Sequence, residues 1–506
     1  MIRFNSFLLF FIILLGCSHE KVSLRDRIPT DALVVGKVNS QQFLKENALN
    51  LFSMMDWSEI GDESSIVNAG IDPFSNAYFY ITGTGFQDLQ LNFLTKLSDH
   101  NAFEDWLKQE KHEVQGGEIK FSFLGPNIGV SFDEEVAMWS LTLALPVVKE
   151  VCLRAFMRDE RTSERIKEIE MGLESSSHLS IWFDSQKLSE IYKAAQQILP
   201  LLGLEIPIVP YEPSSQSDLL EMNFNSGQVL VKNTRFFSDE EFMTYKALHQ
   251  NHLSPLTRSE NYDESILNLN LRLDPHQLIQ RCSSNPAVEG MIDQQLSGYL
   301  RLSELDSIID GRIHFEFYGM QEKLIDVYQS ALNESTGEYN ALKRQARKSI
   351  PTGVLIVGLK SKRPLEQKFA FLMQHLEKAG DWFLLEPELE VKLEDQRLIV
   401  ASGEKAINHM KKDPVPNSAG TTNSDKRSIN FRMSAGQVCG EAKAYVKGLS
   451  PIFEVLGGVL SDIYMDDLDV QDSRVTETYR IQFQSQENSL MQLKKILERM
   501  KQLYHF

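Results

Sequence analysis

The chain has 506 residues, of which 42% are hydrophobic and 24% charged, and its formal net charge at pH 7 is −18. These proportions are typical of a globular protein with a proper core, and the length allows two or three domains. The negative charge argues against nucleic acid as a partner, because binding to phosphates needs basic patches.

The amino terminus has the pattern of an export signal. Arg3 precedes an unbroken apolar run over residues 7–15, which is shorter than the ~20 residues that span a bilayer. Leu14-Leu15-Gly16-Cys17 resembles a lipobox, the motif read by lipoprotein-processing enzymes. The resemblance implies a signal peptide over residues 1–16, acylation of Cys17 and a lipid bilayer as partner. The alternative is an ordinary signal peptide, or an uncleaved anchor, with a chance cysteine.

Residues 17–27 are expected to form a charged tether. Position 18 holds Ser, whereas some lipoproteins that stay in the inner membrane carry Asp there, so we expect the outer membrane of a bacterial cell envelope. The sequence leaves open whether the chain faces the periplasm or the outside.

A short segment occurs twice. Residues 28–36 (Ile-Pro-Thr-Asp-Ala-Leu-Val-Val-Gly) match residues 350–358 (Ile-Pro-Thr-Gly-Val-Leu-Ile-Val-Gly). Both copies are rich in β-branched residues, and a helical pattern follows each, which predicts a strand-to-helix unit. A looser version has a small polar residue between strand and helix. Such a residue can cap the helix by accepting hydrogen bonds from its first N–H groups. The predicted caps are Asn39, Asp184, Asp274 and Ser434.

Periodicity predicts the remaining elements. The strands are expected at residues 77–82, 119–123, 129–132, 138–145, 219–225, 228–233, 267–273, 311–318, 391–393, 398–401 and 475–483. The helices are expected at residues 41–55, 102–111, 163–173, 186–199, 240–249, 276–297, 322–347, 365–379, 437–463 and 486–503. Pro286 and Pro451 should break or kink two of them.

The mixture predicts an α+β fold of repeated strand–helix units with largely antiparallel sheets, arranged as two similar halves or more. We place the main boundary near Lys348. An N-terminal α+β region then covers residues 28–348, with a subdomain split near 207–217. A C-terminal α+β domain covers residues 349–506, with a mobile polar loop at 413–428.

The lipobox at 14–17, the opening at 28–36 and the capped helix start at 39–44 together resemble an uncharacterised family of Bacteroidetes lipoproteins, known only as a domain of unknown function (DUF4836). The resemblance covers most of the chain in size and order, although its motifs are short. It implies an envelope address and an architecture, and no catalytic residue.

Two groups of side chains have the spacing of metal ligands. His249 and His252 could share one helix face and bind a metal, and Asp466, Asp467 and Asp469 could offer oxygens to calcium. The first pair lacks the His-Glu-x-x-His pattern of zinc proteases, and the second lacks the glycine and closing glutamate of an EF-hand. We therefore expect solvated side chains in both places, and no cofactor.

Three cysteines other than Cys17 are far apart: Cys152, Cys282 and Cys439. The absence of a Cys-x-x-Cys spacing excludes zinc-ribbon and thioredoxin-type motifs. The sequence leaves two alternatives for these cysteines: one disulfide, or three buried thiols.

The resulting hypothesis is a membrane-anchored envelope lipoprotein that binds a protein or glycan partner and is not an enzyme. Two alternatives are an envelope hydrolase whose site is assembled from distant residues, and a small-molecule or metal-binding protein.

Overall fold

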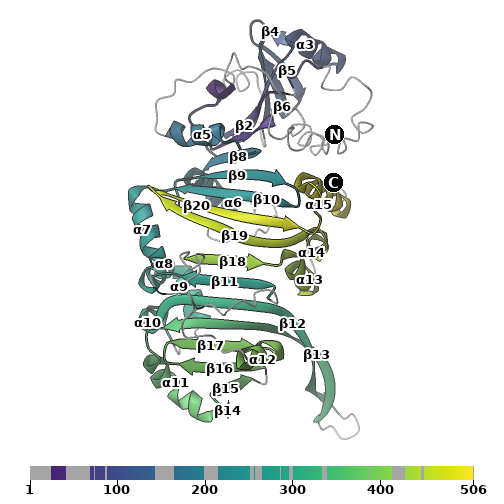
Figure 1. The fold of residues 1–506 in the computed structure, drawn as a ribbon. Coiled ribbons are helices and arrows are strands. Elements are labelled where there is room, and N and C mark those ends of the chain that lie inside the picture. Colours follow the sequence, from purple (N-terminus) through teal and green to yellow (C-terminus); the bar gives the residue numbers. More distant parts are fainter. Residues whose placement is uncertain are drawn as a thin grey trace. The chain divides into compact units, whose positions relative to one another are not determined.

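The computed structural model describes residues 24–40, 69–72, 74–85, 88–142, 165–198, 215–250, 253, 256, 265–284, 286–295, 300–332, 339–386, 388–412, 428–445 and 450–504. By its internal contacts the chain divides into two compact units. Unit 1 comprises residues 1–241, 466–480 and 485–495, and unit 2 comprises residues 242–465, 481–484 and 496–506. Both units combine helices with antiparallel strands, which confirms the α+β class (Figure 1).

Unit 1 is built on a sheet whose strands follow the order β4-β5-β6-β7-β3-β2-β1-β8-β9-β10-β20. The strands are β1 (Val34–Val38), β2 (Ala77–Thr82), β3 (Gln90–Lys96), β4 (Gln115–Gly116), β5 (Lys120–Gly125), β6 (Ile128–Phe132), β7 (Val136–Thr142), β8 (Leu179–Asp184), β9 (Ser217–Asn225), β10 (Gln228–Phe236) and most of β20 (Arg474–Phe483). The helices are η1 (Leu24–Arg27), α3 (His100–Gln109), α5 (Arg165–Glu174), α6 (Ser185–Ile198) and part of α15 (Ser489–Tyr504).

Two apolar cores hold unit 1 together. In the first, Ile169 and Leu173 of α5 pack with Trp182 and Leu219 of the sheet. In the second, Phe103 of α3 packs with residues of β6 and β7. Leu24 is 1% exposed within the first core, so residues 24–27, the last part of the predicted tether at 17–27, belong to the folded unit.

Unit 2 is built on strands in the order β19-β18-β11-β12-β13-β17-β16-β15-β14. The strands are β11 (Leu267–Arg272), β12 (Ile309–Leu332), β13 (Tyr339–Leu359), β14 (Glu377–Ala379), β15 (Trp382–Glu386), β16 (Leu389–Glu394), β17 (Arg397–Ser402), β18 (Ile429–Met433) and the first half of β19 (Leu460–Gln471). The helices are α7 (Asp239–His249), α8 (Pro275–Ser283), α9 (Pro286–Gln295), α10 (Leu302–Ile308), α11 (Arg363–His375), α12 (Glu404–Lys412), α13 (Ala435–Tyr445) and α14 (Ser450–Gly457).

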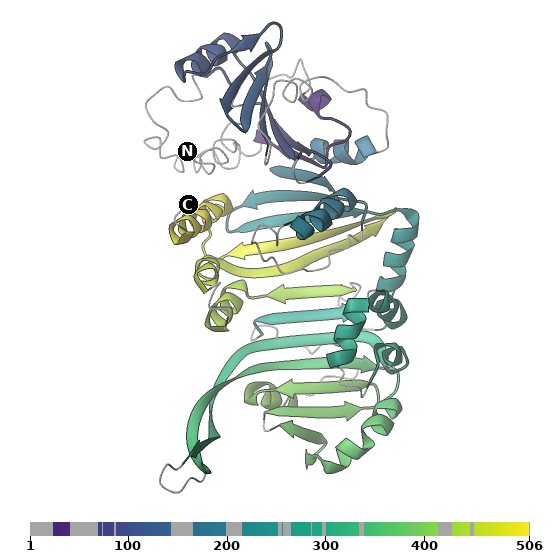
Figure 2. The same cartoon turned by 180° about the vertical axis from the view of Figure 1, so that it is seen from behind.

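The helices of unit 2 lie mainly at the ends of its strands. Both views place α8, α10 and α11 beside one end and α13 and α14 beside the other (Figures 1 and 2). Helix α12 packs through Ala406, Ile407 and Met410 on apolar residues of β13 and β17, which forms the core of this unit.

Among the described strands, β5-β6-β7 and β15-β16-β17 are sets of three successive antiparallel neighbours, and so are β1-β2-β3, β8-β9-β10, β11-β12-β13 and β18-β19-β20. In the last three sets one or more helices follow the first strand. Two predicted caps are confirmed, because Asp184 Oδ1 accepts from Lys187 N (3.0 Å) and Asp274 Oδ1 from Gln277 N (2.9 Å). The side-chain amide of Asn39 donates to Ser176 O, and the helix that Asn39 is predicted to cap, at 41–55, lies outside the described residues.

The helix predicted for residues 322–347 is wrong. Residues 322–332 belong to β12 and residues 339–347 to β13, and these strands pair continuously from Gly319 with Thr352 to Leu332 with Tyr339. Both views show the two strands extending beyond their neighbours (Figures 1 and 2). Leu324, Tyr328 and Leu332 have helical spacing, but cross-strand pairing outweighs this local preference.

The same hairpin changes the predicted domain boundary, since Lys348 lies inside β13 and the units divide near Glu241 instead. The helix predicted for 437–463 is broken before Pro451, as expected, but it ends at Gly457, and β19 begins at Leu460. The loop predicted at 413–428 lies outside the described residues except for Ser428, and so does most of 207–217. Among the helices of the described part, none is long and apolar enough to cross a membrane.

Candidate functional site

The predicted lipidation site and one of the predicted metal ligands cannot be placed: Cys17 and His252 lie outside the described residues. His249 sits on α7, where its ring stacks on Tyr245 and its Nδ1 lies 2.7 Å from Ser428 Oγ. Its contacts are therefore those of a packed side chain at a helix end.

The predicted calcium ligands lie along β19 and not after a helix. Side chains alternate along a strand, so Asp466 points to the opposite face from Asp467 and Asp469. Asp466 pairs with Arg480 (2.6 Å), and Asp469 accepts a hydrogen bond from the amide of Gln471 (2.8 Å). Within the described ranges no three His, Cys, Asp or Glu side chains gather as metal ligands would.

Cys282 and Cys439 are free thiols, and Cys152 lies outside the described residues. Cys439 is buried on α13, which raises the pKa of its thiol. Burial of this kind is typical of a cysteine that serves packing.

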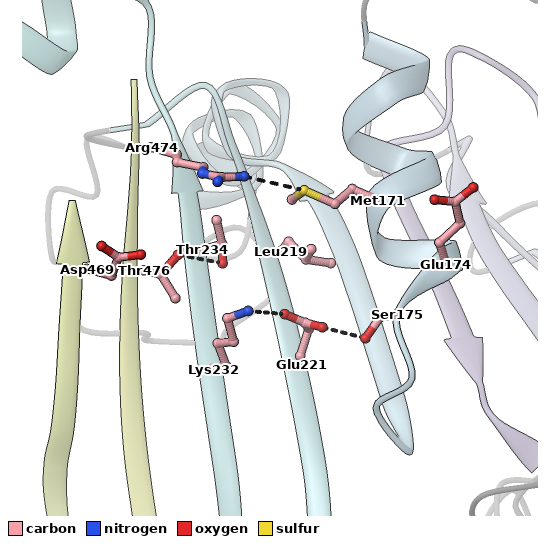
Figure 3. Close-up of a pocket in the computed structure, with 10 residues that line it drawn as sticks. All are labelled: Met171, Glu174, Ser175, Leu219, Glu221, Lys232, Thr234, Asp469, Arg474 and Thr476. Carbon is pink, nitrogen blue, oxygen red and sulfur yellow. Dashed lines mark hydrogen bonds and ion pairs between the residues drawn. The ribbon is translucent and has the colours of Figure 1, made fainter. Parts of the chain in front are cut away.

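A pocket of about 340 Å³ lies in unit 1 between the end of α5 and the strands β9, β10, β19 and β20 (Figure 3). This volume is near the lower end of the range for small-molecule sites, about 300 to 1,000 Å³. Its wall combines three carboxylates, two cations, three hydroxyls and two apolar side chains. The lining residues are Met171, Glu174, Ser175, Leu219, Glu221, Lys232, Thr234, Asp469, Arg474 and Thr476.

Strand register sets the polar wall of the pocket. Glu221 of β9 is the direct cross-strand partner of Lys232 of β10, and their charged groups lie 3.3 Å apart. The Glu221 side chain is 12% exposed and that of Lys232 is 51% exposed. The carboxylate end of the ion pair is therefore largely covered, and its ammonium end is exposed.

Hydroxyl groups surround this ion pair. Thr234 Oγ1 and Thr476 Oγ1 lie 3.0 Å apart between β10 and β20. The hydroxyl of Ser175 donates to the carboxylate of Glu221. Figure 3 shows these groups in the middle and at one side of the pocket, with Arg474 at the opposite side.

Two cationic side chains contact the end of α5, which forms the second wall. Lys37 of β1 is 5% exposed, and its Nζ donates to Leu173 O (2.7 Å) and Ser175 O (2.9 Å). Arg25 also donates to Leu173 O, at 3.3 Å. The last carbonyls of a helix lack partners inside the helix and attract positive charge, so these contacts hold α5 against the sheet.

Arg474 is the first residue of β20 after a tight turn. Asp472 and Ser473 both have positive φ (34° and 60°), which is the conformation of a type I′ hairpin. This turn places the Arg474 guanidinium beside Met171 Sδ (3.9 Å) and Gln471 Oε1 (3.3 Å), both uncharged acceptors.

The arrangement is suited to recognition. The hydroxyl of Ser175 donates to Glu221, and Glu221 pairs with Lys232, so these groups hold one another in place. Fixed charges and hydroxyls at set distances can orient a bound polar molecule.

Of the residues that line the pocket, the sequence pointed only to Asp469, and it did so as a possible calcium ligand. The hairpin turn at 225–227 could have pointed to Glu221 and Lys232 as well. Counting outward from that turn pairs residue 221 with residue 232, which places opposite charges side by side. Arg474 and Thr476 carry no such local signal, because β20 reaches β10 from more than 200 residues further along the chain.

No protein family model matches the sequence, and no curated protein matches it. Solved structures of a protein named TP0453 match part of the fold. Its crystal form I is 10% identical over 43% of this chain and 80% of that chain, with a TM-score of 0.28. Its crystal form III is 13% identical over 45% and 86%, with the same TM-score. A likeness at this level supports no argument about function.

Proposed function

We propose that this chain is a lipid-anchored protein of the bacterial envelope that binds a polar ligand in the unit-1 pocket and does not transform it. The proposed address depends on the export signal and the lipobox ending at Cys17. Two or three long acyl chains on that residue would hold the protein on a membrane, since each buried CH₂ contributes about 0.8 kcal/mol.

The observation that carries the binding function is the Glu221–Lys232 pair at the wall of a pocket. The register of β9 and β10 fixes both side chains before any ligand arrives. Pre-organised polar groups lower the entropic cost of binding, so a wall of this kind favours a defined polar ligand. The repeated strand–helix units, and the two similar halves predicted from them, would serve as scaffold for this wall.

Lipidation and membrane localisation are tested by metabolic labelling with palmitate and by membrane fractionation of the full chain in a bacterial host. We expect label on the wild-type protein and its recovery with the outer membrane. Cys17→Ser should lose both, while Cys282→Ser serves as control and should keep both. A wild-type chain without label would refute the lipid anchor.

The binding function is tested by a photo-reactive amino acid at position 476 in living cells. We expect a covalent adduct of defined mass on the peptide that contains this position. The same probe at Met291, which is 59% exposed on α9, is the matched control and should give none. Adducts that are absent at 476, or identical at both positions, would contradict a specific pocket. A protein or glycan adduct at 476 would identify the partner as macromolecular.

A further inference from the structure

We infer that the unit-1 pocket binds a small zwitterion of the amino-acid or dipeptide class, with its carboxylate on Arg474. This inference rests on the proposed function and names its ligand. The charges around the pocket carry the argument.

Each carboxylate of the pocket already has a donor. Glu221 accepts from Ser175 and pairs with Lys232, and Glu174 lies 3.9 Å from Arg25. Asp469 accepts from the Gln471 amide at 2.8 Å. Glu221 and Glu174 therefore each have a cation beside them, whereas the partner given for Asp469 is a neutral amide, which does not compensate its charge.

Arg474 differs from Glu221 and Glu174, because it has no oppositely charged partner among the described atoms. Its contacts within the described part of the chain are the sulfur of Met171 and the amide oxygen of Gln471, which are both neutral. A guanidinium offers five N–H donors in a planar fork that matches a carboxylate. An anionic group in the pocket would supply the counter-charge that the described protein atoms do not.

The other charged residues of the pocket determine which kind of anion can bind beside Arg474. Three carboxylates and two cations line the pocket, so a ligand with a double negative charge, such as phosphate, would be repelled. A molecule that also carries an ammonium group avoids this repulsion, because that group can face Asp469 or Glu174. Leu219 and Met171 give a small apolar surface for a side chain. The volume of about 340 Å³ accommodates an amino acid or a dipeptide.

The test uses the purified full chain and four probes: the dipeptide Ala-Ala, its N-acetyl derivative, its carboxy-terminal amide and inorganic phosphate. Thermal unfolding and calorimetric titration are the readouts, because a ligand of the native state raises the unfolding temperature. We expect Ala-Ala to bind, and the amide, which lacks the carboxylate, to bind at least tenfold more weakly. The N-acetyl derivative should also bind more weakly.

Variants then assign the contacts. Arg474→Gln should weaken Ala-Ala at least tenfold and make the dipeptide and its amide bind alike. Arg281→Gln, at an exposed position on α8, is the matched control and should bind as the wild type does. If Arg474→Gln is folded and binds Ala-Ala as tightly as the wild type does, the inference is overturned.

The outcomes distinguish a wrong ligand class from a wrong binding pocket. If phosphate alone raises the unfolding temperature, and Thr234→Val with Thr476→Val abolishes the effect, the zwitterion is wrong and the binding pocket stands. If none of the four probes binds and position 476 captures nothing in cells, both proposals fail.

Discussion

The ring of Phe79 lies directly over the backbone of Gly36, its cross-strand partner. A Cβ at position 36 would come within 2.0 Å of Phe79 Cζ. Glycine is therefore required here to make room for a ring on the neighbouring strand.

We predict that Gly36→Ala destabilises the protein by about 1–3 kcal/mol, the usual cost of overpacking. The ring has little freedom to move aside, because it is half-buried and packs on Phe93 at a centroid distance of 5.9 Å. Denaturant unfolding measures the effect. The double variant Gly36→Ala with Phe79→Leu should lose less than the sum of the single variants. An unchanged midpoint for Gly36→Ala would show that the ring moves freely.

The second copy of the repeated segment has a glycine in the same position for a similar reason. A Cβ at Gly358 would come within 2.1 Å of Asp310 Oδ1. That carboxylate accepts hydrogen bonds from Arg312, so it is held in place. Gly36 and Gly358 thus share a physical role, although β1 is the first strand of its set of three and β13 is the last.

Local patterns predicted much of the fold. Alternation and turn residues identified most strands, and the caps at Asp184 and Asp274 were found because an N-cap depends on a few adjacent residues. The 322–347 segment was mistaken for a helix because the spacing of its apolar residues does not show that its two described arms, 322–332 and 339–347, pair with each other as strands.

The burial of β11 also could not be read from its sequence. Asn268, Asn270 and Arg272 are buried, while the leucines that alternate with them are half-buried. On this buried polar face, His314 of β12 makes a hydrogen bond with Asn270, and Asn270 donates to Asn268. The candidate pocket was missed for the same reason, since Arg474 and Lys232 come together only through tertiary pairing.

We predict that Lys37→Met lowers the free energy of unfolding by about 2 kcal/mol, because the carbonyls at the end of α5 lose a charged donor. It should also weaken ligand binding, since Ser175 belongs to the pocket and accepts from Lys37 through its carbonyl. Thermal unfolding and titration with Ala-Ala measure the two effects. Lys187→Met, at an exposed position on α6, is the control and should change neither. Wild-type stability in Lys37→Met would show that water replaces the ammonium without loss.

Asp218 gives the protein a pH dependence that can be tested. Burial raises the pKa of this carboxyl above its usual 3.8, against the opposing effect of the hydrogen bonds from Ser185 and Ser215. The folded state then binds the proton more tightly than the unfolded state. This group therefore lowers stability as pH rises from 3.8 through the folded-state pKa, and the penalty is fully present above it.

Asp218→Asn removes this titration and keeps an oxygen that can accept from either serine. We predict that stability relative to wild type improves from acid pH to neutral pH. Denaturant midpoints of both proteins between pH 4 and pH 7 are the measurement. Parallel curves across this range would mean that Asp218 has the same pKa in both states. Asp184→Asn, at the half-buried cap of α6, controls for a general effect of removing a carboxylate.

A buried polar chain in unit 2 should behave as one cooperative group. His314 is fully buried, with Nδ1 2.6 Å from Asn270 Oδ1 and Nε2 2.9 Å from Glu316 Oε1. Glu316 also accepts from Tyr318, and Asn270 donates to Asn268 at 3.0 Å. Removing one member leaves its neighbours buried without their partner, which costs more than the bond itself contributes.

We therefore predict that His314→Leu and Glu316→Leu each destabilise the protein by about 3 kcal/mol, and that the double variant loses less than the sum by about 1–3 kcal/mol. The double variant removes both partners of the His314–Glu316 contact, whereas each single variant leaves one buried polar side chain without the other. Denaturant unfolding of the four proteins in the cycle gives the coupling energy directly. Additive losses would mean that the two side chains are satisfied independently, and the polar face of β11 would then be held by Asn268 and Asn270 without help from β12.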